Sequence, residues 1–179
     1  MRPGAKKKGG RRAAPPRVLR NAHHRFFCRP FALNLEALVG VGIRAVINLM
    51  EEGEKDHHGN SFVPYGPLME GIAAENGGTV SCLRFPVRDL DIPTPDGMKK
   101  ILDAVDRFIF LNVQVYVHCW GGRGRTGTVV GCRLARHGSA RAGGALDMIA
   151  RLRASVPDVG LPSPETGAQR NMVSQWLSL

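Results

Sequence analysis

The chain has 179 residues, of which 43% are hydrophobic and 22% charged, so it is long enough for one domain with a substantial core. No apolar run approaches the roughly 20 residues that cross a bilayer, which excludes a membrane-spanning helix. The four cysteines have no paired or zinc-type spacing, which argues against a disulfide framework and a structural zinc site. We therefore expect a cytoplasmic protein of a reducing compartment, with no metal and no cofactor.

The net charge of +10 is concentrated at the N-terminus. The first 35 residues hold ten Lys and Arg and no acidic residue, whereas the remaining 15 basic residues are balanced by 15 acidic ones. Residues 1–16 have nothing to bury, so we predict a disordered basic arm there and one folded domain over residues 17–179. Such an arm is either a solvated tail or a contact for anionic surfaces such as nucleic acid or lipid.

The folded part alternates predicted helices and strands. A short helix at 33–39, with Asn34 as its N-cap and Gly40 at its end, precedes a β-branched strand at 43–50. The polar segment 51–66 is expected to be a loop that borders the site. The remaining predicted elements are a helix at 67–76, a strand at 79–85, a helix capped by Thr94, a strand at 113–118, and helices at 126–135, 142–153 and 165–177. This alternation predicts an α/β fold with a mostly parallel sheet covered on both faces.

Cys119 ends the last predicted strand and opens a glycine-rich turn that leads into a helix. Backbone N–H groups converge on an anion at such a turn, and Gly121, Gly122 and Gly124 let the backbone curl around it. Beside arginine at a helix N-terminus, the pKa of a cysteine falls from roughly 8.5 to about 3.5–7.5, which yields a thiolate. The planar fork of Arg125 matches two phosphate oxygens. These residues predict covalent transfer of a phosphoryl group to sulfur.

Other interpretations of these residues are less specific. A nucleotide-binding turn is the alternative, but no Gly-Lys-Ser/Thr follows the glycines as it does in a Walker loop. The other cysteines, Cys28, Cys82 and Cys132, are interpreted as small buried hydrophobic residues.

The run from His118-Cys119 to Arg125-Thr126 has the form His-Cys-x5-Arg-Thr, which resembles the signature of the cysteine-dependent protein tyrosine phosphatase superfamily, in its compact dual-specificity-like branch. The resemblance extends more loosely over residues 33–176. It implies a central, mostly parallel sheet of four to five strands flanked by helices, and it makes 17–179 a single catalytic domain. It also implies that Thr126 stabilises the departing thiolate, while His118 is expected to orient the loop.

The leaving group needs a proton, and two aspartates are candidates for the general acid. Both lie in the segment 86–93, which begins with Pro-Val-Arg and ends with proline. The family places its acid four residues before a proline, after a Pro-hydrophobic-x sequence, and this pattern favours Asp89 over Asp91. The alternative for either residue is an aspartate that caps local N–H groups of the loop.

Two variable positions of the turn bear on the substrate. Trp120 is expected to pack under the loop, whereas Arg123 resembles the second basic residue of relatives that handle phosphoinositides. An arginine that pairs with local carboxylates is the alternative for Arg123. Gln169 weakly resembles the water-positioning glutamine of some relatives, and an exposed helix glutamine is its alternative. The predicted substrate-binding set is Trp120, Gly121, Gly122, Arg123, Gly124, Arg125 and Gln169.

The leading function from the sequence is hydrolysis of phosphotyrosine in proteins, and of phosphoserine or phosphothreonine if the pocket is shallow. A phosphoinositide or inositol-phosphate phosphatase with the same chemistry is the first alternative. The others are a phospho-binding pseudophosphatase, an arsenate reductase or rhodanese-like protein, and an RNA 5′-phosphatase.

Overall fold

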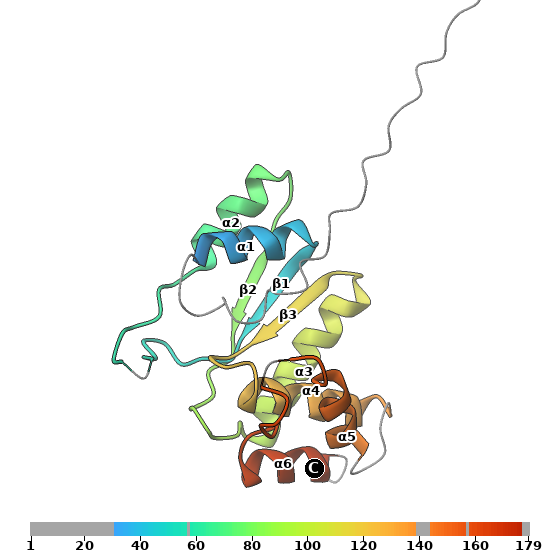
Figure 1. Cartoon of the computed structure of the whole chain (residues 1–179). Helices are drawn as coiled ribbons and strands as arrows, with labels where there is room; N and C mark the ends of the chain where they lie inside the picture. The colour runs from blue at the N-terminus through green and yellow to red at the C-terminus, as the bar shows by residue number, and fades with distance from the viewer. Residues whose placement is uncertain (1–30, 57, 139–143, 157, 177–179) are drawn as a thin grey trace, which may run out of the picture.

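The computed structural model describes residues 31–176, except 57, 139–143 and 157 (Figure 1). The predicted basic arm and the boundary at residue 17 lie outside this range. The described elements are α1 (Phe31–Gly40), β1 (Ile43–Asn48), α2 (Gly66–Glu75), β2 (Ser81–Arg84), α3 (Pro95–Phe110), β3 (Gln114–His118), α4 (Gly124–Arg136), α5 (Gly144–Leu152) and α6 (Gly167–Gln175). Among these described elements, no helix is long and apolar enough to cross a membrane.

The sheet has three parallel strands in the order β2-β1-β3. Asn48 at the end of β1 pairs with Arg84 on one side and with His118 on the other. The predicted number of four to five strands is wrong, because the sheet of the described residues has three. The β-branched pattern itself supports three strands, and the larger number came from the family resemblance.

The helices cover both faces of the sheet, as the alternation predicted (Figure 1). On one face, Val46 of β1 packs in a cluster with Leu35 of α1 and Met69 of α2. On the other face, Ile47 belongs to a second cluster that includes Leu102 of α3. Consecutive residues of one strand therefore enter opposite cores, as a buried central strand requires.

Helix boundaries differ from the prediction where local signals are weak. The predicted Thr94 cap is confirmed, because its hydroxyl accepts a hydrogen bond from Gly97 N–H at 3.0 Å. Asn34 is not an N-cap, since α1 already begins at Phe31 and no glycine or proline separates the two. Helix α4 begins at Gly124, before the predicted start, so its first turn contains Arg125.

The topology brings three loops to one edge of the sheet. The carboxyl ends of parallel strands lie at the same edge, where ligands bind in open α/β sheets. The loop after β1 contains Glu54, the loop after β2 contains Asp89, and the loop after β3 begins with Cys119. Residues that are far apart in the sequence can therefore meet at this edge.

Candidate active site

The turn between β3 and α4 carries the candidate nucleophile. Cys119 follows β3 directly, and the first N–H groups of α4, which lack intrahelical acceptors, begin at Gly124. Gly122 has φ +66°, a left-handed conformation that a side chain would strain. At Gly124, an added Cβ would lie 3.1 Å from Gln169 Oε1 and 3.2 Å from Glu165 Oε2. The turn is therefore tightly curled, and it packs closely against Glu165 and the first turn of α6.

The structure brings Cys119 and Thr126 together. The Thr126 hydroxyl donates to the Cys119 sulfur across 3.1 Å, and Cys119 is only 3% exposed. Because Thr126 lies in the first turn of α4, the sulfur faces the helix N-terminus, where the backbone favours negative charge. The structure therefore brings the two residues into contact, and their catalytic roles stay predictions.

Arg125 is held by carboxylates from two different loops. Its Nη1 and Nη2 donate to the two oxygens of Glu54 at 2.7 and 2.8 Å, and Nη1 also donates to the Val87 carbonyl at 3.0 Å. Nη2 lies 2.9 Å from Asp89 Oδ1. Burial lowers the pKa of Arg125, but the hydrogen bond to Glu54 and nearby negative charges outweigh it, so the pKa is raised above its usual value. The guanidinium is thus both charged and fixed in orientation.

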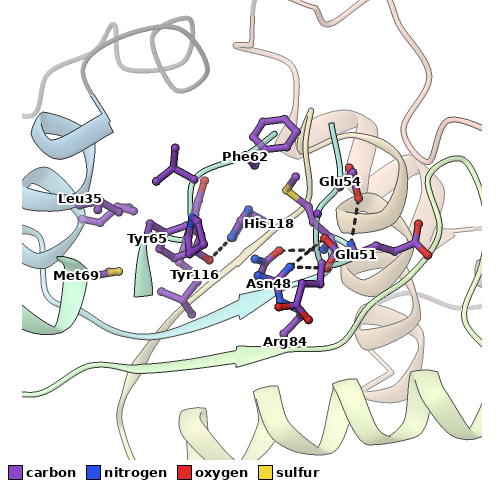
Figure 2. A pocket seen from close by; sticks show the side chains of 17 residues that line it. Leu35, Asn48, Glu51, Glu54, Phe62, Tyr65, Met69, Arg84, Tyr116 and His118 are labelled. Carbon is purple, nitrogen blue, oxygen red and sulfur yellow. Dashed lines mark hydrogen bonds between the residues drawn. The ribbon is translucent and has the colours of Figure 1, made fainter. Parts of the chain in front are cut away.

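Glu54 is a site residue that the sequence analysis did not name. It lies in the predicted border loop, where its own oxygen also accepts the N–H of Glu51 at 3.1 Å (Figure 2). One signal was present in the sequence. The loop after β1 carries a glutamate and starts at the same edge of the sheet as the turn that carries the arginine. A buried arginine needs a negative charge beside it, which such a glutamate can supply.

We expect Glu54→Gln to lower kcat/KM by about 10- to 100-fold, because the amide cannot accept from both nitrogens of Arg125 and the guanidinium loses its orientation. Steady-state kinetics and inhibition by inorganic phosphate measure the effect, and inhibition should weaken in parallel. The control is Glu52→Gln, an exposed neighbour in the same loop. A Glu54→Gln enzyme with wild-type phosphate affinity would contradict the positioning role.

The two candidate acids have different surroundings. Asp89 is half-exposed and reaches Arg125. The Asp91 carboxylate instead accepts the N–H of Ile92 at 2.8 Å, which is the loop-capping alternative. Leu90 between them has φ +62°, a costly conformation for a branched side chain, and the loop therefore turns sharply at this residue. Of these two carboxylates, only Asp89 contacts Arg125 in the described structure, and its role as the general acid stays a prediction.

His118 forms a hydrogen-bonded connection behind the nucleophile (Figure 2). Its Nδ1 lies 3.1 Å from the Cys119 carbonyl, its Nε2 lies 2.5 Å from the Tyr65 hydroxyl, and its ring stacks on Tyr116. Burial lowers the pKa of His118, and the positive charges of Arg84 and Arg125 lower it further. A neutral ring donates from Nδ1 to the carbonyl and accepts at Nε2 from Tyr65, whose pKa is raised by burial. These contacts fix the orientation of the ring, and the orienting role of His118 in the loop stays a prediction.

Gln169 is completely buried, so the exposed-glutamine alternative is wrong. Its Oε1 accepts the N–H groups of Glu165 and Thr166 at 3.0 and 3.1 Å, and its Nε2 donates to the Asp91 carbonyl at 3.1 Å. The side chain therefore connects the start of α6 to the acid loop. Its water-positioning role stays a prediction, which these backbone contacts do not favour.

The two variable positions of the turn also have defined partners. Trp120 packs against the core cluster beside Cys119, as expected. Arg123 forms an ion pair from Nη2 to Glu165 Oε1, which corresponds to the carboxylate-paired alternative.

A cavity of about 210 Å³ is lined in part by Glu54 and His118 (Figure 2). It is lined by the loop after β1 together with residues of α1, α2 and the sheet, including Leu35, Met69 and Tyr116. Its described lining residues include Glu54, which bonds Arg125, but neither Cys119 nor Arg125, so this cavity adjoins the turn after β3 without containing the candidate nucleophile.

The fold is that of the protein tyrosine and dual-specificity phosphatase class. Residues 25–139 match the family model described as "Tc-R-P: Polymorphic toxin system, DSP-PTPase phosphatase", and the chain belongs to that family. The described residues of this segment contain β1–β3, the acid loop and the nucleophile turn.

Solved structures of phosphatases share the fold. Tk-PTP in its active form is 25% identical, with a TM-score of 0.63 over 84% of this chain and 88% of that chain. PTPMT1 in complex with PI(5)P is 20% identical, with a TM-score of 0.60 over 81% and 84% of the two chains. At that identity, the second likeness shows the fold alone.

Curated relatives match over a shorter segment. An uncharacterized protein of Methanocaldococcus jannaschii is 39% identical over 51 residues, which are 28% of this chain and 32% of that protein. The match therefore spans about a third of that relative's length.

Proposed function

We propose that the chain hydrolyses phosphotyrosine, and also phosphoserine and phosphothreonine, in proteins through a cysteinyl-phosphate intermediate on Cys119. The observation that carries this proposal is the arrangement of one connected site. The sulfur accepts from Thr126, and Arg125 in the same turn contacts Asp89 from the opposite loop. A nucleophile, an oxyanion-binding cation and a proton donor are thus grouped at one sheet edge.

In the first step, the phosphate group of the substrate occupies the turn, where N–H groups and Arg125 bind its oxygens. The Asp89 carboxylate leaves Arg125, takes up a proton from solvent and faces the leaving oxygen. The Cys119 thiolate attacks phosphorus, the P–O bond to the substrate breaks, and Asp89 donates its proton to the departing oxygen.

In the second step, water attacks the phosphorus of the cysteinyl phosphate. Asp89, now a carboxylate, accepts a proton from this water by microscopic reversibility. The S–P bond breaks, and inorganic phosphate and the Cys119 thiolate form. The Thr126 hydroxyl, which already donates to the sulfur, stabilises the negative charge that returns there.

The ion pair between Arg123 and Glu165 is the reason that we favour protein substrates over phosphoinositides. The phosphoinositide alternative relied on a second free cation in the turn, and this guanidinium is already paired with Glu165. As part of the same proposal, residues 17–179 form the catalytic domain, the arm 1–16 contacts anionic surfaces, and the enzyme acts in the cytoplasm.

Rapid mixing of the full chain with p-nitrophenyl phosphate tests the proposal. We expect a burst of nitrophenolate close to the enzyme concentration, and acid-quenched protein that carries labelled phosphate on Cys119. EDTA should leave the rate unchanged, because no proposed step uses a metal. Phosphotyrosine peptides should be turned over with a higher kcat/KM than phosphoinositides. Phosphate binding without turnover would instead identify a pseudophosphatase and overturn the proposal.

A further inference from the structure

Arg123 is a basic residue inside the phosphate-binding turn whose charge is already compensated. It is the N-cap residue of α4, directly before Gly124, and its carbonyl accepts a hydrogen bond from Ser163 Oγ at 2.8 Å. Its Nη2 pairs with Glu165, while its Nε–H is buried and has no hydrogen-bond partner. Within the described part of the chain, Glu165 is therefore the carboxylate that compensates this guanidinium.

Glu165 is held against the turn by the start of α6. Its N–H donates to the buried Gln169 amide, and Gln169 together with Thr166 forms a capping box at the N-terminus of the helix. The Glu165 carbonyl accepts from Arg170 at 2.7 Å. A Cβ added at Gly124 would lie 3.2 Å from the Glu165 carboxylate, so this carboxylate is in close contact with the turn. Its negative charge is thus held beside the turn that is proposed to bind phosphate.

The charges around the turn suit a substrate with one phosphate group. Arg125 binds that group once Asp89 has moved to the leaving oxygen, and Glu54 continues to orient it. A neighbouring second phosphate would need a free cation, which Arg123 does not supply while it is paired. Such a phosphate would also lie near the negative charge of Glu165, and like charges at short range repel.

Building on the proposed function, we propose that Glu165 is a specificity-determining residue. It neutralises Arg123, so that the turn accepts isolated phosphomonoesters and discriminates against substrates with adjacent phosphates, such as inositol polyphosphates. Glu165→Gln keeps the shape of the side chain and removes its charge. Arg123 is then free to bind a second phosphate, and the preference shifts towards polyphosphorylated ligands.

A double-mutant cycle on the full chain tests this proposal. Calorimetry measures the affinities for inositol hexakisphosphate and inorganic phosphate, and their ratio is compared among wild type, Glu165→Gln, Arg123→Gln and the double variant. We expect Glu165→Gln to improve the ratio for the hexakisphosphate about tenfold, the worth of a charge-assisted hydrogen bond, and the double variant to lose this gain. Glu75→Gln, an exposed carboxylate on α2, controls for net charge and should change the ratio less than twofold.

Two results would overturn the proposal. The first concerns the ratio of the affinities for hexakisphosphate and inorganic phosphate. The proposal fails if Glu165→Gln does not improve this ratio, or if the improvement persists in the double variant that lacks Arg123. The second is a tenfold loss of hexakisphosphate affinity in Arg123→Gln alone, which would mean that Arg123 already serves the ligand. The comparison of Arg123→Gln with wild type tests whether Arg123 already binds the ligand, even if Glu165→Gln does not fold. Binding needs no turnover, so failure here is distinct from failure of the burst experiment.

Discussion

A Cys119→Ser enzyme should hydrolyse p-nitrophenyl phosphate about 10⁴-fold more slowly than the wild type, and no burst should appear. The serine hydroxyl stays protonated at neutral pH, so the group that attacks phosphorus is lost. The fold should persist, because the substitution changes one atom at the end of β3 and Thr126 can still donate to the new oxygen. Stopped-flow kinetics measure the rate, and retained binding of inorganic phosphate shows that the turn is intact.

Cys132→Ser is the matched control. This thiol is fully buried in α4, and burial raises its pKa to about 12, so it is not a nucleophile at neutral pH. Its replacement should leave kcat/KM within a few-fold of wild type but lower the free energy of unfolding by about 1–3 kcal/mol, because a hydroxyl is buried in an apolar core. Equal losses of activity in the two serine variants would contradict the assignment of Cys119.

Asp89→Ala should lower kcat by about 10²- to 10⁴-fold for phenyl phosphate, whose leaving group needs a proton. The loss should be much smaller for p-nitrophenyl phosphate, because nitrophenolate leaves readily without one. The reason lies in the geometry, since Asp89 is the carboxylate of the loop that reaches Arg125. Steady-state rates for the two esters, measured across pH, give the leaving-group dependence.

The control for this prediction is Asp91→Ala, which removes a carboxylate that accepts a local backbone N–H. We expect its kcat for both esters to fall by less than tenfold, with an unchanged difference between the esters. Small and equal losses in both variants would show that neither aspartate is the general acid.

The sequence was most informative where function depends on neighbouring residues. The order of strand, cysteine, glycines, arginine and helix lies within one local stretch, and the contact between Cys119 and Thr126 follows from the curl of that stretch. Asp89 was favoured over Asp91 by a family pattern. In the structure the two carboxylates have different partners, Arg125 for Asp89 and the Ile92 N–H for Asp91, and the assignment of the acid stays a prediction.

Other features depend on contacts between distant segments, which no local pattern specifies. Glu54 reaches Arg125 because two loops leave the same edge of a parallel sheet. Gln169 is buried with its amide bonded to the Asp91 carbonyl of the acid loop, which is 78 residues away in the sequence. The predicted number of strands was wrong for a different reason. It was taken from the family resemblance and not from the three β-branched segments of the sequence.

The buried amide of Gln169 has a mechanical consequence. Two segments that are remote along the chain, namely the acid loop at Asp91 and the start of α6 at residues 165–166, are joined by this one side chain. Motion that carries Asp89 towards a substrate must therefore either pivot about the tethered Asp91 carbonyl or break that tether. Local unfolding of α6 would thus displace the loop that carries the proposed proton donor. Catalytic activity should therefore decrease at temperatures where the central sheet is still folded.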